Sequence, residues 1–469
     1  FENLPKINIR AKKTKCKSAN YDRAEYKSAA QEYKVEVRDP VHGTIELNES
    51  EAILFESPEF QRLRSIKQLG FSEFSFPGAV HNRLIHSVGV CHLAGLAFDK
   101  IFAKFVFTSK KNRQRLRQTL RLGAFLHDIG HGPLSHSTEE VMPLLADLNI
   151  KAYDFKNFTE QRPTLKRRAN HEDYTIKYVT EAPLSDLISK NFPDIEPLAV
   201  AALIDKTINP PGTDYFYDQG LDFRPILSQL VSSELDVDRM DYLERDSFFC
   251  GTNYGKIDLG WVLSNLLYHI EHNKIYLCIN RRALYTFDDF LISRHHMHLM
   301  VYFHHKSIVY EEMLVRYLTA PDCGFALPPD LAAYTKCTDF ALYQHLAQTT
   351  NQWAQRIALR QPYRMLSEFH YVKENPRPLL TQAILEKEGI DVIHASSHTR
   401  LSKYHTSSPE DQALTIYVVD QYDRWDHPQP IEQCTEIFKK YEETRIIDRL
   451  YVAPENYKKA EKIIKDQKV

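Results

Sequence analysis

The strongest constraint on the fold is a nearly continuous series of helical patterns between residues 35 and 320. The segment "SPEFQRLRSIKQLG" (57–70) begins with Ser57 as a predicted N-cap and Pro58 at the first helical position, and it ends at Gly70. Apolar residues recur along it at helical spacing. Further helices are predicted at 82–105, 113–130, 171–181, 196–208, 225–249 and 287–318. A chain with this pattern folds mainly as packed α-helices.

Three other parts of the chain differ from this pattern. Residues 1–34 are lysine-rich and aperiodic, so we expect a basic N-terminal arm. The segment "VRDPVHGTIEL" (37–47) predicts a short hairpin. After Pro321, strand-like segments at 391–397, 413–420 and 445–454 alternate with helical ones at 432–444 and 456–467. We therefore predict a mainly α fold with a helical core at 35–320 and a smaller α+β lobe at 321–469.

Composition limits the classes of partner. The 469 residues are 43% hydrophobic and 26% charged, which is typical of a folded globular chain. Lysine plus arginine (60) nearly balances aspartate plus glutamate (62), so local charge must hold any anionic ligand. The basic runs at 109–117 and 162–168 lack interleaved aromatic residues, which makes nucleic acid the less favoured partner.

Cysteine usage and hydropathy bear on location. The seven cysteines are scattered and form no C-x-x-C pair, as is usual in a reducing compartment. No apolar stretch approaches the roughly 18 residues of a membrane helix, and no signal peptide pattern opens the chain. We expect a cytoplasmic protein with no membrane partner.

The segment "LHDIGHGPLSH" (126–136) places three histidines and an aspartate at the end of an apolar helical run. Adjacent helical residues point about 100° apart, yet His127 and Asp128 can both reach one ion beside the helix end. Partners of suitable chemistry occur at His86 and Asp238, each inside a predicted helix. Two imidazoles and two carboxylates favour an open divalent site over a closed structural zinc site. Iron, manganese, zinc, nickel and magnesium are all compatible with this set.

A metalloprotease is the minor alternative. His131 follows His127 by four residues, which is the spacing of the zincin motif H-E-x-x-H with aspartate in place of glutamate. A zincin helix continues through both histidines, whereas Gly130, Gly132 and Pro133 unwind the chain here. Aspartate is also a short base for the zincin geometry.

The motifs "NRLIHSVG" (82–89), "FLHDIGHGPLSH" (125–136), "HED" (171–173) and "LDVDRMDYLERD" (235–246) occur in this order. Together they resemble the HD-domain metal-dependent phosphohydrolases, specifically the deoxynucleoside triphosphate triphosphohydrolases related to SAM-and-HD-domain enzymes. The resemblance extends from "DPVHG" (39–43) to "YFHH" (302–305), and we expect no SAM domain ahead of it. It implies hydrolysis of a deoxynucleoside triphosphate to deoxynucleoside and tripolyphosphate, with His86, His127, Asp128 and Asp238 as the metal ligands.

The resemblance also implies roles for the side chains around the metal. The catalytic positions are His131, His136, Glu139, His171 and Glu172. His136 is the predicted proton donor, because the ordinary pKa of imidazole lies near neutral pH, and Glu139 stands where relatives carry aspartate. The substrate-binding positions are Gln68, Leu69, Arg83, Arg239, Tyr242, Asp246, Arg294, His298 and Tyr302.

Six of these residues recur at every fourth position on two predicted helices: Asp238, Tyr242 and Asp246 on one, and Arg294, His298 and Tyr302 on the other. Such spacing places each trio along one helical face. By resemblance, arginines hold the phosphates, Asp246 accepts a hydrogen bond from the sugar 3′-hydroxyl, and the two tyrosines crowd the position of a ribose 2′-hydroxyl. No segment is seen to read a base edge, so we expect broad base specificity.

Regulation is a further implication of the resemblance. Relatives of this type are activated by nucleotides bound between subunits, which implies a homo-oligomer, dimer or tetramer, and an activating nucleotide. Gln61 and Arg64 match positions that read a guanine nucleotide. Glu56 replaces an aspartate and Arg38 replaces an amide, which counts against guanine-dependent activation, and Arg282 is another candidate for this site.

Two other functions fit the same sequence. An HD-type nucleotidase or phosphodiesterase acting on monophosphates or cyclic nucleotides would share the metal residues without needing Arg294 or Tyr302. A nucleotide sensor would bind without turnover, although the complete ligand set and His136 favour catalysis. Both enzymatic interpretations are compatible with additional Mg²⁺ bound to the nucleotide.

Overall fold

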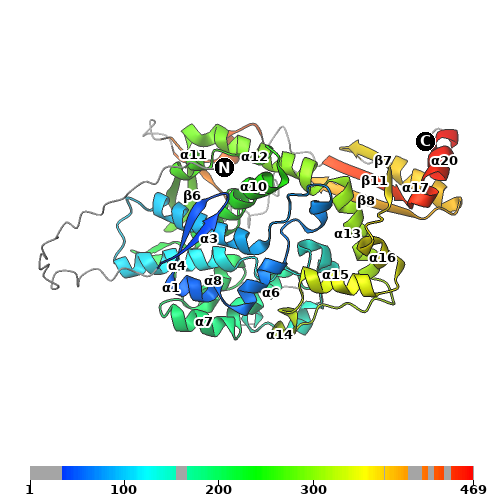
Figure 1. Cartoon of the computed structure of the whole chain (residues 1–469). Coiled ribbons are helices and arrows are strands. Elements are labelled where there is room, and N and C mark those ends of the chain that lie inside the picture. The colour runs from blue at the N-terminus through cyan, green and yellow to red at the C-terminus, as the bar shows by residue number, and fades with distance from the viewer. Residues whose placement is uncertain are drawn as a thin grey trace, which may run out of the picture.

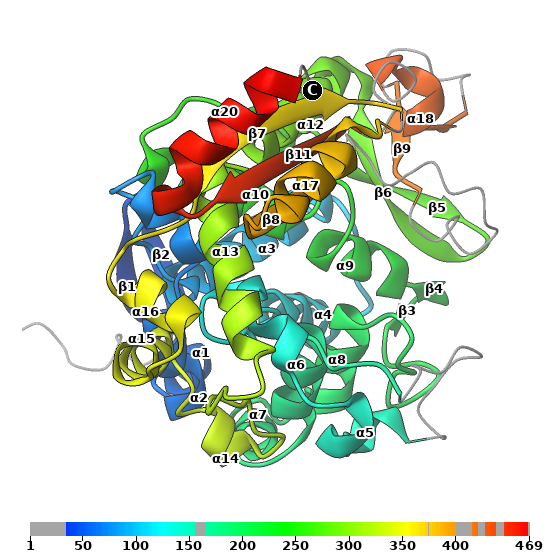
Figure 2. The ribbon, with the colours of Figure 1, turned by 90° about the vertical axis from the view of Figure 1, so that its right-hand side faces the viewer.

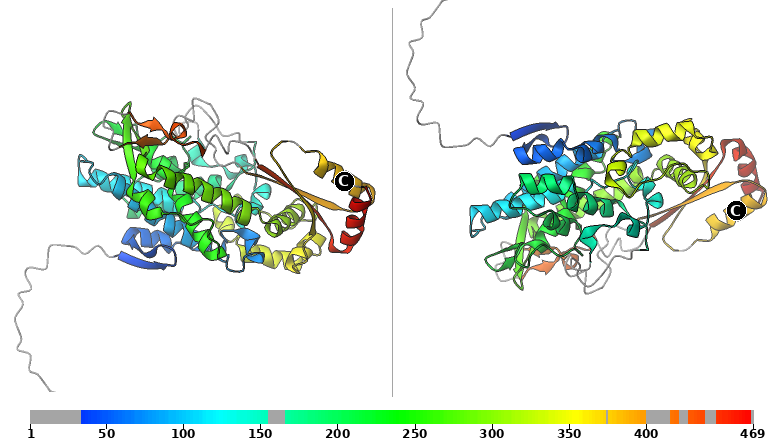
Figure 3. Two further views of the ribbon diagram at one scale, coloured as in Figure 1. Left: turned by 90° about the horizontal axis from the view of Figure 1, so that it is seen from above. Right: turned by 90° about the horizontal axis from the view of Figure 1, so that it is seen from below.

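The computed structural model describes residues 34–154, 166–373, 375–399, 415–420, 427–437 and 445–467. A helical body makes up most of the molecule, and a smaller lobe with its own sheet lies at one end (Figures 1 and 3). The helices of the body are α1 (Glu49–Phe55), α2 (Pro58–Gln61), α3 (Arg83–Ile101), α4 (Lys110–Leu126), α5 (Leu145–Leu148), α6 (His171–Thr180), α7 (Leu184–Asn191), α8 (Pro197–Ile204), α9 (Arg224–Val231), α10 (Val237–Cys250), α11 (Leu259–Ser264), α12 (Leu284–Met297) and α13 (His305–Leu318). The predicted mainly α fold is confirmed.

Helix α3 lies at the centre of the body and packs against both α4 and α10. Its Leu93 and Ala94 belong to an apolar core shared with α9, α10 and α12, while its Leu84 and Val88 belong to a second core shared with α1, α6 and α8. A helix that is apolar all round is a buried helix. Among the described residues, α3 alone matches a membrane span by length and composition, and 72% of that window is buried inside the protein.

The β structure of the body has two parts. β1 (Lys34–Asp39) and β2 (Gly43–Asn48) form the predicted antiparallel hairpin, whose turn is closed by Asp39 Oδ1, which accepts from the N–H groups of Val41 and His42 at 2.9 and 2.8 Å. The second part is a six-stranded sheet that the sequence analysis did not predict as a unit. Its strands are β3 (Tyr217–Asp218), β4 (Leu221–Asp222), β5 (Leu266–Glu271), β6 (Lys274–Asn280), β9 (Tyr417–Val419) and β10 (Gln429–Pro430), with β6 pairing to β4, β5 and β9.

The lobe is built on a three-stranded antiparallel sheet in the order β7 (Arg364–Tyr371), β11 (Arg445–Val452) and β8 (Val392–Thr399). Helices α17 (Arg377–Lys387) and α20 (Tyr457–Gln467) cover one face of it (Figure 2). Other parts of 321–469 lie against the body: α14 (Leu331–Tyr334) joins its core, α15 (Asp339–Gln348) and α16 (Gln352–Ala358) pack beside α13, and β9 pairs with β6. The boundary at residue 320 stays a prediction.

Four predicted helices are interrupted within the described residues. The segment 57–70 forms α2 and then a 3₁₀ turn over Arg62–Ser65. The segment 225–249 splits into α9 and α10, because Asp236 accepts from the N–H groups of Ser233 and Arg239 and so begins a new helix. The segment 287–318 passes through a π-helical turn at His298–Tyr302. The predicted helix at 432–444 begins as α18 (Ile431–Cys434). Its end at 438–444, the arm at 1–33 and the basic residues 162–165 lie outside the described residues.

Candidate active site and metal centre

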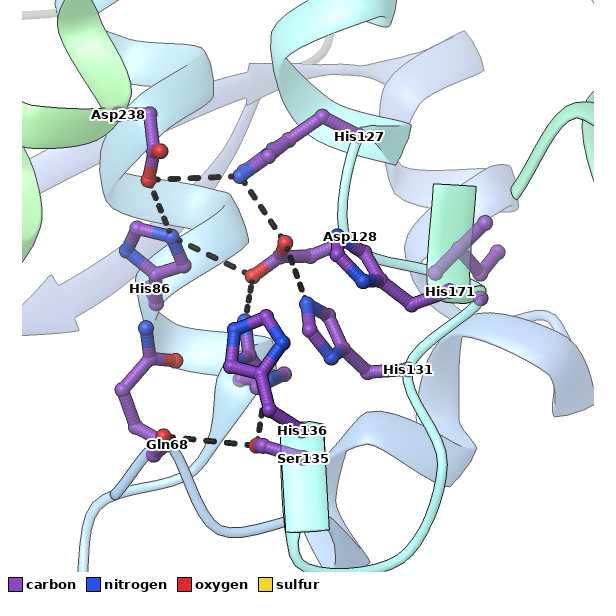
Figure 4. Close-up of polar contacts among 12 residues, drawn as sticks. Gln68, His86, His127, Asp128, His131, Ser135, His136, His171 and Asp238 are labelled. Atoms are coloured by element: carbon purple, nitrogen blue, oxygen red, sulfur yellow. Dashed lines mark hydrogen bonds and ion pairs between the residues drawn. The ribbon is translucent and has the colours of Figure 1, made fainter. Parts of the chain in front are cut away.

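The four predicted metal ligands lie together where α3, α4 and α10 meet (Figure 4). His86 Nε2 is 3.0 Å from Asp238 Oδ1 and 3.4 Å from Asp128 Oδ2. His127 Nε2 is 3.3 Å from Asp128 Oδ1 and 3.5 Å from Asp238 Oδ1. Helix α4 ends at Leu126 with His127 as its C-cap, so His127 and His131 do not share a helical face as they would in a zincin. Residues far apart in the sequence thus converge on one point.

The chemistry of this cluster fits a divalent cation. Among the described residues, the buried Nε2 atoms of His86 and His127 have no hydrogen-bond partner, although carboxylate oxygens surround them. The opposite ring nitrogens are held in place: His86 Nδ1 donates to Asp241 Oδ2 at 2.7 Å, and His127 Nδ1 donates to the Ala124 carbonyl at 2.8 Å. Such contacts direct Nε2 toward a metal in known metal sites. Donor type and orientation therefore both suit a metal ion.

The electrostatics of the cluster point to the same conclusion. Burial lowers the pKa of His86, but Asp238, Asp241 and Asp128 outweigh it and raise the pKa to about 10. The pKa of His127 is raised as well. Burial lowers it, but the carboxylates of Asp128 and Asp238 outweigh burial. The pKa of Asp128 is held well below its usual range against the effect of burial, with Arg83 as the largest lowering influence. Protons on the two imidazoles thus compensate the negative charge of the surrounding carboxylates, and a bound cation would displace these protons.

A second cluster adjoins the first and contains the predicted catalytic residues. The rings of His131 and His171 stack at a centroid distance of 3.8 Å. Glu139 Oε1 accepts from Nδ1 of His136 at 3.0 Å and from Nδ1 of His171 at 2.6 Å. Burial raises the pKa of Glu139, but these two hydrogen bonds outweigh it and lower the pKa. The pKa of His131 is lowered by burial and by Arg83 and His171, so this buried imidazole is neutral.

One cavity joins both clusters. Its volume is ≈ 240 Å³. Ten of its lining residues were predicted as site residues: Gln68, Arg83, His127, Asp128, His131, His136, His171, Glu172, Asp238 and Tyr242. Three lining residues were not predicted: Ile204, Val231 and Ser232. Leu69 follows Gln68 and packs, partly buried, against the apolar core.

The three arginines predicted to contact the substrate, of which Arg239 and Arg294 were predicted to hold the phosphates, are already paired with carboxylates. Arg239 Nη1 lies 2.6 Å from Asp236 Oδ2. Arg294 Nη1 lies 2.6 Å from Glu234 Oε2. Arg83 Nη1 contacts Asp128, one of the metal residues. The carboxylates fix the direction of each guanidinium group, so an incoming anion would have to share these arginines.

The two predicted helical faces meet at a buried hydrogen-bonded group. Tyr302 Oη donates to Asp246 Oδ2 at 2.8 Å, and His81 Nε2 contacts Asp246 Oδ1 at 2.7 Å. Burial, together with the Asp246 carboxylate, raises the pKa of Tyr302. The rings of Tyr242 and His298 lie 6.2 and 5.0 Å from that of Tyr302. Tyr242 therefore links this group to the cavity that it lines.

Only part of the predicted regulatory set comes together. Arg64 Nε donates to Gln61 Oε1 at 2.6 Å, and Gln61 Nε2 donates to the carbonyl of Phe55, the residue before Glu56. Arg38 instead contacts Thr44 in the hairpin. Arg282 donates to Asn265 and lies over the Trp261 ring. The regulatory role of all five residues stays a prediction.

Ion pairs reduce the positive charge of the basic run at 109–117. Arg113 and Arg117 both pair with Asp99, and Lys111 pairs with Asp194. These contacts do not favour a nucleic-acid surface, which remains the less favoured prediction.

Four supporting residues were missed by sequence reasoning. Asp241 Oδ2 accepts from His86, while its Oδ1 contacts His42 Nε2 at 2.7 Å. Arg245 donates to both oxygens of Asp241 and to Asp39 Oδ2, each at 2.8 Å. The motif "DPVHG" is thereby connected to a metal residue. The i, i+4 spacing of Asp241 and Arg245 was the available signal.

Comparison with known proteins gives a consistent result. The sequence matches the HD domain over residues 83–246 and the HD associated region over residues 263–378. It is 30% identical to the uncharacterized protein YwfO of Bacillus subtilis over 82% of this chain and 84% of that protein. It is 27% identical to the deoxynucleoside triphosphate triphosphohydrolase SAMHD1 homolog of Dictyostelium discoideum, over 61% of this chain and 49% of that protein.

A hypothetical protein of Aquifex aeolicus has a similar crystal structure. The TM-score is 0.67 at 22% identity, and the match covers 92% of this chain and all of that one. The chain spans 56% to 61% of the length of the first curated relatives that it matches.

Proposed function

The chain belongs to the HD-domain family of metal-dependent phosphohydrolases, and we propose that it hydrolyses deoxynucleoside triphosphates to deoxynucleoside and tripolyphosphate. The observation that carries this proposal is the cavity itself. It joins the metal residues to His136 on one side and to Tyr242 on the other, and Tyr242 leads to the Asp246–Tyr302 pair. The Dictyostelium relative is named for the same activity.

His86, His127, Asp128 and Asp238 would hold the cation. Iron, manganese, zinc, nickel and magnesium all accept this donor set. When bound, a divalent cation polarises phosphoryl oxygens and activates water. Mg²⁺ bound to the nucleotide would add further positive charge.

His136 would donate the proton that the leaving oxygen requires. Glu139 Oε1 accepts from His136 Nδ1, which leaves Nε2 as the atom that can face substrate. Glu139 holds His171 in the same way, and His171 stacks on His131. The carboxylate thus orients the imidazoles of both His136 and His171.

Other residues would position the nucleotide. Arg83, Arg239 and Arg294 offer directed guanidinium groups for phosphate oxygens. Gln68 and Leu69 would contact the sugar, with Asp246 as acceptor for its 3′-hydroxyl. Tyr242, His298 and Tyr302 would close the space next to C2′, so that a ribose is rejected by shape. A homo-oligomer, an activating nucleotide and a cytoplasmic location are parts of the same proposal.

A substrate panel tests the proposal. Purified protein is incubated with each divalent metal and with deoxynucleoside triphosphates, ribonucleoside triphosphates, monophosphates or cyclic nucleotides, and the products are separated by chromatography. We expect tripolyphosphate and deoxynucleoside only from the deoxynucleoside triphosphates. His127→Ala and Asp128→Ala should abolish turnover, whereas the exposed His398→Ala should not. Turnover of monophosphates or cyclic nucleotides alone would support the nucleotidase or phosphodiesterase alternative, and binding without turnover would indicate a sensor.

A further inference from the structure

The loop between His127 and His136 has an unusual backbone. Leu134 and Ser135 both adopt left-handed conformations, with φ of 55° and 59°. Neither residue is glycine, so the Cβ atoms strain this geometry. Two such residues in succession persist only where surrounding contacts hold them. The loop carries His131 and delivers His136 to the cavity, so whatever holds it bears on the site.

The side chain of Asp339 holds this loop. Its Oδ1 accepts from the Leu134 N–H at 2.7 Å, and its Oδ2 accepts from the Lys67 N–H at 2.9 Å. Asp339 is buried, with 3% of its surface exposed. Ser135 Oγ donates to the Lys67 carbonyl at 2.6 Å and accepts from Arg83 Nε at 2.8 Å. The Asp339 carboxylate therefore joins the loop that precedes His136 to the segment that precedes Gln68. Gln68 and His136, which are both labelled in Figure 4, line the cavity.

Two carbonyl groups of the same loop accept hydrogen bonds from Tyr334 and Arg62. Tyr334 Oη donates to the Gly130 carbonyl at 2.8 Å. Arg62 Nη2 donates to the His131 carbonyl at 2.6 Å, while its Nε donates to the Cys337 carbonyl at 3.1 Å. The Arg62 guanidinium also lies over the Tyr334 ring, 4.7 Å from its centroid. These buried contacts satisfy loop groups that no helix or strand pairs.

The side chains of Tyr334 and Asp339 come from outside the HD domain. That domain spans 83–246, whereas Tyr334 and Asp339 belong to the HD associated region at 263–378. We propose that Asp339 is a positioning residue: with Tyr334, it keeps the strained loop in place so that His136 and Gln68 face one cavity. The roles of His136 and Gln68 rest on the proposed function, whereas the role of Asp339 in holding the loop does not.

Hydrogen exchange and steady-state kinetics test the inference on the full chain. Asp339→Asn keeps the shape but replaces one acceptor oxygen by an NH₂ group. Exchange of a peptide covering 129–141, followed by mass spectrometry, should become at least tenfold faster. Turnover per metal-loaded chain should fall at least tenfold, while bound metal stays at the wild-type level. Asp330→Asn is the matched control, because Asp330 caps α14 in the same segment without touching the loop.

A second variant covers a failure of Asp339→Asn to fold. Tyr334→Phe removes only the hydroxyl and keeps the ring, which also stacks on Tyr174 at 3.8 Å. It should also make exchange in the loop faster and turnover slower, each by a smaller factor than Asp339→Asn does. Wild-type exchange in the 129–141 peptide of the folded variants, or wild-type turnover per metal-loaded chain, would overturn the inference. If the wild-type protein turns over no deoxynucleoside triphosphate, the proposed function fails, and loop exchange still decides the role of Asp339.

Discussion

The contact between Asp241 and His86 predicts how strongly the protein holds its metal. Asp241→Asn removes the charged acceptor that fixes the His86 ring, while the four metal residues remain. The Arg245 guanidinium keeps a carboxylate partner in Asp39, at 2.8 Å, so no buried charge is left uncompensated. The variant should therefore fold, and its main defect should be a lower affinity for the metal.

The magnitude follows from the geometry. An asparagine has one acceptor oxygen, whereas Asp241 accepts from His86 on one oxygen and contacts His42 on the other, with Arg245 bonded to both. If the amide oxygen faces His86, the NH₂ group faces an Arg245 donor. If the amide is turned over, the NH₂ group faces His86 Nδ1. In neither arrangement is the His86 ring held as firmly as by the carboxylate. Loss of a contact of this kind lowers metal affinity by about 10–100-fold. That ratio corresponds to about 1.4–2.8 kcal/mol.

Metal titration measures the effect directly. Chelator-treated protein is titrated with manganese or zinc in competition with a chromophoric chelator, which gives a dissociation constant without any substrate. Glu51→Gln is the matched control, because Glu51 pairs with the buried Arg121 away from the metal residues. That control should lose about 3–5 kcal/mol of stability with unchanged metal affinity. A dissociation constant of Asp241→Asn equal to that of wild type would refute the orienting role.

Two further predictions concern stability. In Gly89→Ala, the new Cβ would lie 1.9 Å from Asp241 Oδ1 and 2.5 Å from Arg245 Nη2, so α3 and α10 must separate. We expect a loss of about 1–3 kcal/mol in thermal denaturation together with weaker metal binding. Gly123→Ala should be tolerated, since its nearest contact is 3.5 Å away, and equal stability of the two variants would contradict the steric argument. The second prediction concerns pH: burial raises the pKa of Asp339 to about 6, despite hydrogen bonds from the Leu134 and Lys67 N–H groups. Because this folded-state pKa lies above the unfolded value of about 3.9, the contribution to stability is complete below about pH 4 and is lost as pH rises through 6. Relative to Asp339→Asn, wild type should lose about 2–3 kcal/mol between these limits, and parallel pH profiles of the thermal midpoint would exclude this.

Local sequence signals predicted the helices well where the helix depends on its own residues. The predicted helix at 82–105 appears as α3, because Asn82 caps it and apolar residues surround it. The breaks in the longer segments depend on tertiary contacts. The 3₁₀ turn at 62–65 places Arg62 where it reaches Cys337, 275 positions away in the sequence. Likewise, β6 pairs with β9, which is more than 130 residues distant, and periodicity carries no signal for such a partner.

The candidate site was predictable for residues with distinctive chemistry and not for those that support them. The adjacent His127 and Asp128, the residue types of His86 and Asp238 inside predicted helices, and the resemblance to HD-domain enzymes indicated the metal residues. The structure brings all four together. Asp241 is marked in the sequence only by its i, i+4 spacing to Arg245, and Asp339 lies in a segment where no helix was predicted. Their roles follow only from which backbone or imidazole group lies within hydrogen-bond distance after folding.

Charge balance around the cavity explains why cations and directed arginines are both needed. A triphosphate brings several negative charges, but Arg83, Arg239 and Arg294 are each neutralised by a neighbouring carboxylate. These arginines therefore add direction and hydrogen bonds more than net positive charge. On the proposed function, the compensating positive charge would come from the divalent cation at the His86 and His127 cluster and from Mg²⁺ on the nucleotide. On the proposed function, we therefore expect the site to bind a metal–nucleotide complex in preference to a free anion, because the metal supplies the positive charge that the paired arginines lack.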